Sequence, residues 1–425
     1  MKKQLIKRII GKQNIYRIRK VRHIIYLILM YPIVVLMPRD KKKILFGAWG
    51  GEQFSDNPKY FLKYILSLNQ GFKCYWFGNE SIRDKVEAFE GVTFVLKGST
   101  KAKWHLLTAK WLVCNLGIAV DVTNDFPTYG RIKQLSFWHG TAFKGVCRRN
   151  YHAELSRNPL KRFEQYFLSL DFSIAVPRYS WASFSFEEMR FLMPFEVPWQ
   201  FKPEMSIAAG TARVDYLINN MKNEAEIRRV KTSISKALGI PVSKKWYLYM
   251  PTWRQGVAIN YSFVSSEQLE RTNKILEEKN AILIEKQHPQ VLRKNSVDGG
   301  WHGNVFMITQ NNAVLEIDTQ ELLLASDMLI TDYSSCCCDF APMNRPVIHY
   351  VYDYEEYTST ERKEAHDLKE YAMGFVAYTE NELITALSYD EKDLLKYKGP
   401  KANELLEGEK GHACETFAKW VGLVE

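Results

Sequence analysis

Two histidines in separate halves of the chain stand just after runs that predict buried strands. His139 follows the run 134–138, and His288 lies two residues after the run 282–286. Because an imidazole titrates near neutral pH, a histidine at a strand end can act as a general base when it faces a cleft. A single such histidine is more often structural, but a pair at the strand ends of opposite halves favours catalysis. We therefore expect His139 and His288 to be catalytic.

The residues after His139 add groups that suit a phosphate. Gly140 allows a ligand to approach the backbone closely, while Thr141 and Lys144 supply a hydroxyl and an amine within about one turn. We expect these three residues to bind substrate.

A serine pair lies in a polar turn between a predicted strand at 327–331 and an apolar segment at 336–340 that predicts a helix. Free N–H groups at a helix start, the helix dipole and the hydroxyls of Ser334 and Ser335 together suit a phosphate. The alternative is an ordinary helix cap, since serine is preferred there in any case. The loop that follows the next predicted strand is acidic and aromatic, as expected of a substrate-contacting loop.

Two further predicted strands are followed by cationic and aromatic residues. Arg213 and Arg254 can each bridge phosphate oxygens with two hydrogen bonds, and Trp253, beside Thr252, can stack on a base. The alternatives, an ion pair of Arg213 with Asp215 and core packing of Trp253, stay open.

Predicted strands alternate with helical patterns over most of the chain. The first series lies at 44–49, 73–77, 93–96, 111–116, 134–138, 172–176 and 206–209, and the second at 246–250, 281–285, 304–308, 327–331, 347–350 and 374–378. Such alternation predicts parallel sheets covered by helices on both faces. We expect an α/β, GT-B-like fold of two doubly wound Rossmann-type domains, 44–220 and 221–425, facing a cleft.

The N-terminal segment 1–43 is both basic and apolar. Its apolar run 24–37 is shorter than the roughly 20 residues that span a bilayer, and Pro32 interrupts it. Apolar residues at helical spacing among Lys and Arg predict a helix on an anionic membrane surface, with its basic flanks on the cytoplasmic side. The alternative is a basic helix packed on the protein itself.

Composition and charge bear on which kinds of partner and metal site the protein could have. The chain has 425 residues, of which 46% are hydrophobic, and a net charge of +10. Residues 1–43 carry thirteen Lys and Arg against one Asp, so the rest of the chain carries −2 and a nucleic-acid partner is not expected. The seven cysteines lack the spacing of a metal site, and neither catalytic histidine has a third ligand nearby, so no metal ligands are predicted.

Six motifs in order carry a resemblance to a known family. They are Gly51-x-x-Phe54-Ser55-Asp56-Asn57-Pro58-Lys59, Trp138-His139-Gly140-Thr141-x-x-Lys144, Gly210-x-x-Arg213-x-Asp215, Pro251-Thr252-Trp253-Arg254, His288-Pro289, and Ser326-Asp327-x-Leu329-Ile330-Thr331-Asp332-Tyr333-Ser334-Ser335-x-x-x-Asp339-Phe340. Together, over roughly residues 44–385, they resemble the CDP-glycerol glycerophosphotransferase family of teichoic acid and related surface polymer synthesis.

The resemblance implies peripheral attachment to the cytoplasmic face of a bacterial membrane. It also implies transfer of glycerol phosphate from CDP-glycerol to a hydroxyl of a lipid-linked polymer, with release of CMP. His139 would be the general base. His288, Arg213 and the serine pair would bind the diphosphate; Thr252, Trp253 and Arg254 would line the donor site. Asp339 would hold its helix start or contact the donor. No cofactor is required, although the site leaves room for Mg²⁺.

The chain also departs from the family pattern. Ala142 and Phe143 stand where Pro-Leu is usual, and residues 358–373 lack the expected Arg-Gly-Phe-Tyr-Phe-like stretch. These departures leave the donor open between CDP-glycerol and a related CDP-polyol such as CDP-ribitol. Two other functions remain as alternatives: a GT-B glycosyltransferase that uses a nucleotide sugar, and a non-catalytic membrane-binding protein.

Overall fold

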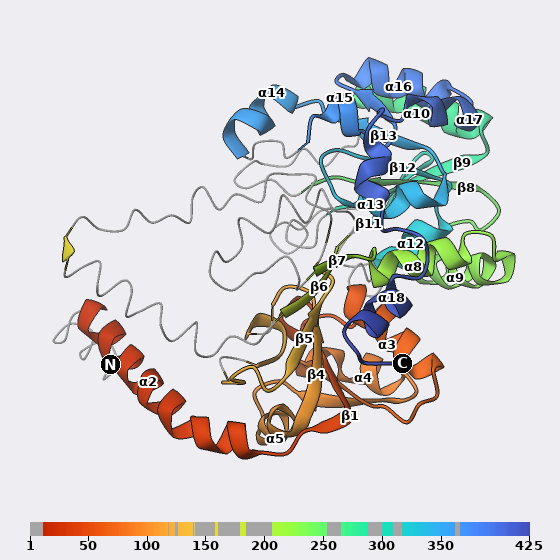
Figure 1. The fold of residues 1–425 in the computed structure, drawn as a ribbon. Coiled ribbons are helices and arrows are strands. Elements are labelled where there is room, and N and C mark those ends of the chain that lie inside the picture. Colours follow the sequence, from red (N-terminus) through yellow and green to blue (C-terminus); the bar gives the residue numbers. More distant parts are fainter. Residues whose placement is uncertain are drawn as a thin grey trace.

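The computed structural model describes most of the chain. The described residues are 12–117, 119–123, 126–138, 140, 158–159, 179–183, 206–252, 265–287, 300–308, 317–361 and 366–425. They form two seven-stranded sheets, drawn mainly in orange and in teal to blue in Figure 1.

The first sheet has the order β3-β2-β1-β4-β5-β6-β7, and its strands are parallel. The strands are β1 (Asp40–Phe46), β2 (Lys73–Gly78), β3 (Val92–Leu96), β4 (Ala109–Cys114), β5 (Lys133–Ser136), β6 (Tyr179–Ser183) and β7 (Ser206–Ala208). The strand expected at 172–176 lies outside the described residues. Strand β6, which the sequence did not predict, lies between β5 and β7.

The second sheet has the order β10-β11-β9-β8-β12-β13-β14 and is parallel except for the antiparallel pair β10 and β11. Its strands are β8 (Lys245–Met250), β9 (Ala281–Lys286), β10 (Gly300–His302), β11 (Val305–Ile308), β12 (Met328–Thr331), β13 (Val347–Tyr350) and β14 (Phe375–Ala377). Parallel pairing places the carboxyl ends of these strands at one edge of the sheet, where ligands bind in open α/β sheets.

Helices connect the strands. They are α2 (Lys12–Leu36), α3 (Asp56–Ser67), α4 (Arg83–Glu87), α5 (Thr100–Thr108), α8 (Ala212–Asn220), α9 (Glu224–Leu238), α10 (Ser266–Glu278), α12 (Thr319–Ala325), α13 (Cys336–Phe340), α14 (Tyr354–Glu356), α15 (Leu368–Tyr371), α16 (Glu380–Ser388), α17 (Glu391–Leu394) and α18 (Ala413–Trp420). Local chemistry sets several of their ends. Gly239, for example, ends α9 with a left-handed φ of 70°, which glycine adopts without steric cost.

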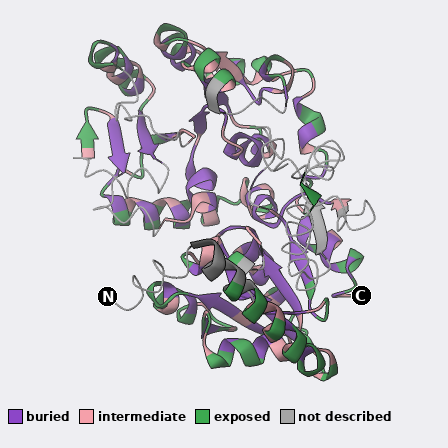
Figure 2. Cartoon of the chain, turned by 90° about the vertical axis from the view of Figure 1, so that its left-hand side faces the viewer, coloured by how far each residue is buried: buried purple, intermediate pink, exposed green. Residues whose placement is uncertain are grey.

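Alternate residues of the central strands face helices on opposite sides, and the strands are largely buried in Figure 2. In β1, Ile44 and Phe46 pack in a core with Phe61 of α3, whereas Leu45 packs in a different core with Leu106 of α5. This alternation follows from the two-residue period of a strand. The doubly wound α/β architecture expected from the sequence is confirmed.

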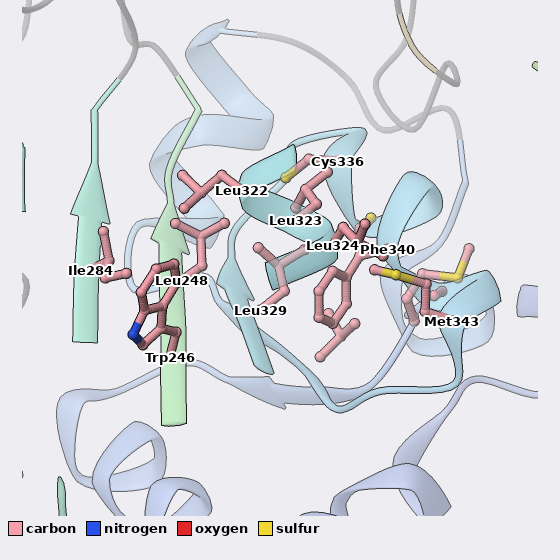
Figure 3. Close-up of a cluster of buried hydrophobic side chains, with 14 of the residues drawn as sticks. Trp246, Leu248, Ile284, Leu322, Leu323, Leu324, Leu329, Cys336, Phe340 and Met343 are labelled. Carbon is pink, nitrogen blue, oxygen red and sulfur yellow. The ribbon is translucent and has the colours of Figure 1, made fainter. Parts of the chain in front are cut away.

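The core above the second sheet carries the serine turn. Figure 3 shows side chains of α12 and α13 packed over Trp246 and Leu248 of β8. Cys336, Cys337 and Cys338 are buried free thiols in this core, so the cysteine run is apolar packing at the start of α13.

The C-terminal helix α18 returns to the first sheet. Phe417 lies 4.8 Å, between ring centroids, from Phe137, and Asp215 accepts hydrogen bonds from the backbone of Ala413 (2.8 Å) and Cys414 (2.7 Å). Helix α18 lies within the range 221–425 that the sequence assigns to the second domain, but it packs against the first sheet. Its apolar face completes the first core, a contact that a linear division of the chain does not capture.

Helix α2 runs through Pro32 as one helix and extends from the first sheet (Figure 1). Leu27 and Val34 are buried against the domain, but Ile28, Leu29 and Leu36 are 66%, 66% and 80% exposed. Together these last three form an exposed apolar face on α2. No helix among the described residues is long and apolar enough to cross a bilayer.

Candidate active site

The structure describes six of the twelve residues that the sequence assigns to the site. They are Gly140, Arg213, Thr252, Ser334, Ser335 and Asp339. The other six, His139, Thr141, Lys144, Trp253, Arg254 and His288, lie outside the described residues.

Gly140 lies against the serine turn of the second sheet. A Cβ atom placed on Gly140 would overlap Ser335 Oγ, lie 3.0 Å from Ser335 Cβ and lie 3.7 Å from Nη2 of Arg213. The backbone next to His139 is thus in direct contact with the turn that the sequence assigns to phosphate binding. Only glycine allows this approach without moving a neighbour.

The serine turn leads directly from β12 into α13. Ser335 occupies the N-cap position, but its side chain makes no capping hydrogen bond to the helix. At the start of the helix, Cys336 N donates to the Ser334 hydroxyl at 3.5 Å, and backbone carbonyls accept from Cys337 N (Ser334 O, 3.3 Å) and Cys338 N (Ser335 O, 3.0 Å). The structure therefore does not use the Ser335 hydroxyl as an ordinary cap, and phosphate binding by the turn stays a prediction.

Arg213, at the start of α8, joins carboxylates from both halves of the molecule. Its Nη1 donates to Asp56 at 2.9 Å, its Nη2 donates to Asp339 Oδ1 at 2.9 Å, and its Nε lies 2.9 Å from Asp339 Oδ2. The pairing with Asp215 that the sequence left open is not formed, because Asp215 caps α18 instead. Direct contact of Arg213 with phosphate stays a prediction.

Asp339 therefore holds Arg213 from within α13. Burial raises the pKa of Asp339 to about 6, although Arg213 and a hydrogen bond from Gln320 Nε2 at 2.9 Å favour its ionised form. The ion pair connects α13 with α8. The roles expected for Asp339, holding the helix start or contacting the donor, stay predictions.

Two consecutive residues at the start of α3 connect the strand ends of the first sheet. Asp56 accepts from Asn115 Nδ2 (2.9 Å), which follows β4, as well as from Arg213. Asn57 is fully buried; its Nδ2 donates to the carbonyl of Trp138 (3.0 Å), and its Oδ1 accepts from Arg213 N (2.9 Å). Because Trp138 precedes His139, these bonds fix the peptide that carries the first catalytic candidate.

Thr252 supports the turn from the neighbouring strand β8. Its N–H and hydroxyl both donate to the Asp332 carboxylate, the hydroxyl at 2.6 Å. The Asp332 carbonyl lies 2.9 Å from Nδ1 of buried His349, whose Nε2 accepts from Met373 N at 3.0 Å. His349 must therefore donate from Nδ1 as a neutral ring, and burial lowers its pKa.

Sequence reasoning missed the ionic contact between α3 and α12. Asp318, the N-cap of α12, accepts from Lys59 Nζ at 2.6 Å and from the Tyr60 hydroxyl at 2.8 Å. Burial opposes ionisation of Asp318, but its donors hold its pKa below the usual value. The Asp-Asn-Pro-Lys stretch 56–59 could have indicated this contact, because charged and polar residues at the start of a buried helix usually have partners.

The assembled geometry suits transfer of a phosphoryl group. A histidine-bearing loop from the first sheet meets a hydroxyl-rich turn from the second, and buried ion pairs fix their relative position. Such reactions depend largely on positioning and on stabilising negative charge. In the described part of the chain, no cluster of three or more His, Cys, Asp or Glu residues could hold a metal ion.

Comparison with known proteins places this geometry in a family. A family model described as CDP-glycerol:poly(glycerophosphate) glycerophosphotransferase matches residues 29–404. The chain is 28% identical over 369 residues to a teichoic acid poly(glycerol phosphate) polymerase of Bacillus spizizenii, covering 84% of this chain and 86% of the relative. It is 26% identical over 368 residues to a teichoic acid glycerol-phosphate transferase of Staphylococcus aureus, with the same two coverages.

A solved structure shares the fold. The wall teichoic acid polymerase TagF superposes with a TM-score of 0.71 at 20% sequence identity, covering 96% of this chain and 97% of TagF.

Proposed function

This chain belongs to the CDP-glycerol:poly(glycerophosphate) glycerophosphotransferase family, and we propose how its own residues carry out the transfer and where it acts. The reaction moves glycerol phosphate, or a related polyol phosphate, from a CDP-activated donor to a hydroxyl of a surface-polymer acceptor and releases CMP. In our proposal His139 takes the proton of the acceptor hydroxyl, and His288 with the serine turn holds the donor diphosphate. No step requires a cofactor, and a bound Mg²⁺ would act only by neutralising phosphate charge.

The contact between Gly140 and Ser335 carries this proposal. It brings the residue after the proposed base within van der Waals distance of the turn proposed to hold phosphate. A general base next to Gly140 and an anion site at the serine turn could act on one reacting phosphorus atom. The alternative of a nucleotide-sugar transferase shares the architecture, so the donor decides between the two functions.

The deciding experiment measures CMP release by the purified protein with membrane extract as acceptor. CDP-glycerol, CDP-ribitol and a panel of nucleotide sugars are compared as donors. We expect CMP release from one CDP-polyol and no turnover of nucleotide sugars. Turnover of a nucleotide sugar without CMP release from either CDP-polyol would contradict the phosphotransferase proposal.

We further propose that α2 binds the cytoplasmic face of a bacterial membrane as a peripheral anchor, with anionic lipid as its partner. The exposed apolar side chains of α2 supply the buried area, and the basic residues of segment 1–43 supply the attraction to anionic headgroups.

Replacing Ile28 and Leu29 together with serine is expected to release the protein from anionic vesicles. Both side chains are 66% exposed, so the change removes apolar contact area without disturbing the core. Burial of two such side chains is worth about 3–6 kcal/mol, which predicts at least a tenfold loss of partitioning in a sedimentation assay. Val242→Ser, which removes an apolar side chain exposed on the second domain, serves as the control. Unchanged sedimentation of the double variant would show that α2 is not the anchor.

A further inference from the structure

Lys286 is a buried cation at the end of β9, and neither the motifs nor the family resemblance gives it a role. Its exposed fraction is 7%. Strand β9 lies two strands from β12, with β8 between them, and runs parallel to both. The carboxyl end of β9 therefore lies at the same sheet edge as the serine turn. Figure 3 shows Ile284 of β9 beside Trp246 and Leu248 of β8.

Lys286 lacks a carboxylate partner among the described residues. Its one hydrogen bond there is a long one, 3.4 Å from Nζ to the Thr319 hydroxyl. Asp318, the neighbouring carboxylate, already binds Lys59 at 2.6 Å and Tyr60 at 2.8 Å. Buried Arg213 binds two carboxylates, and half-buried Arg345 donates to the carbonyls of Leu324 and Ser326. Buried Lys43 also binds a threonine hydroxyl, that of Thr108, but at 2.7 Å rather than 3.4 Å.

Burying an ammonium group without a partner is unfavourable, because its hydration is lost and nothing replaces it. Burial lowers the pKa of Lys286, while Asp318 favours the charged form. The hydrogen bond to Thr319 places the ammonium at the start of α12. An anion that binds beside this cation would stabilise it.

We propose that Lys286 is a binding residue for the diphosphate of the donor, acting with the serine turn. This inference rests on the proposed function, and it adds a contact on β9 to the phosphate site. During transfer, the bond between the transferred phosphorus and the oxygen of CMP breaks, and that oxygen keeps the electron pair. The Lys286 ammonium offsets this charge without giving up a proton, as a fixed positive group does at other phosphoryl-transfer sites.

Lys286→Met separates this role from a structural one. Methionine keeps the unbranched shape and removes the charge. The unfolding midpoint is measured without ligand and with CMP, CDP-glycerol, CDP-ribitol and inorganic diphosphate, and CMP release is measured in parallel. We expect the unliganded variant to unfold at the same temperature as the wild type or higher, because an unpaired buried charge is gone. We expect the ligand-induced shift to be lost and KM for the donor to rise at least tenfold, as for loss of a charge-assisted contact.

Two further variants complete the test. Lys286→Arg retains the charge and is expected to retain the ligand-induced shift. Lys231→Met removes a lysine that pairs with Asp327 at 3.3 Å, and is expected to lower the unliganded midpoint with KM unchanged. If Lys286→Met does not fold, Lys286→Gln is measured in its place.

The outcomes distinguish this inference from the donor assignment. If inorganic diphosphate stabilises the wild type and neither CDP-polyol does, the donor assignment fails. The role of Lys286 is then tested by whether Lys286→Met loses the shift in unfolding midpoint that diphosphate causes. A Lys286→Met variant with a lower unliganded midpoint and an unchanged ligand-induced shift would overturn the inference. So would a wild-type protein that none of the four ligands stabilises.

Discussion

Gly140→Ala is expected to reduce kcat for CMP release by about 100-fold or more, with the protein still folded. The added methyl group would overlap Ser335 Oγ and lie 3.0 Å from Ser335 Cβ, so the loop or the serine turn must move. Displacement of a reacting group by about 1 Å is enough for a loss of this size. The measurement is single-turnover CMP release, with His139→Ala as the reference for loss of the proposed base.

A rescue variant tests the cause of this loss. Ser335→Gly removes both atoms that the new methyl group would meet, so Gly140→Ala combined with Ser335→Gly is expected to be more active than Gly140→Ala alone. The two substitutions should therefore be strongly non-additive, as expected of residues in contact. Additive losses would show that the contact between the loop and the serine turn does not control the reaction.

Arg213→Met is expected to lower the free energy of unfolding by about 3–5 kcal/mol, because it leaves two buried carboxylates without their cation. Asp56 and Asp339 have side chains 5% and 3% exposed, so water cannot replace the guanidinium. Chemical denaturation gives the size of this loss, and CMP release should fall with it because Arg213 holds α13 against the first sheet.

Arg229→Met is the matched control for this substitution. Arg229 also makes a two-point contact with a carboxylate, that of Glu226, but its side chain is 53% exposed. An exposed pair contributes at most about 1 kcal/mol, so the control should remain close to wild type. Equal losses from the two variants would show that burial of the Arg213 bridge has no special importance. Asp339→Asn should cost less than Arg213→Met, because it removes a charge and leaves Arg213 paired with Asp56.

The sequence by itself determined the local structure and the kind of site. The spacing of apolar residues along a strand or helix depends on which of its faces is buried. This spacing can be read from residues that are close together in the sequence. The alternation of strand and helix patterns along the chain therefore predicted two parallel sheets. Polar residues at the strand ends predicted where ligands bind. The serine turn and the histidine-glycine loop were found in this way, and the contact of Gly140 with Ser335 shows that their two strand ends meet.

Only the tertiary structure decided which charged residues pair. The sequence suggested Asp215, two positions away, as a partner of Arg213, but the partners are Asp56, 157 residues earlier, and Asp339, 126 residues later. Asp215 instead caps a helix almost 200 residues further along, which returns the C-terminus to the first sheet. Such pairings depend on how two sheets pack against each other, and spacing along the chain does not report packing. The lack of a carboxylate partner for Lys286 among the described residues arises in the same way. The carboxylate beside its hydrogen-bond partner Thr319 is Asp318, and Asp318 is paired with Lys59 from the other domain.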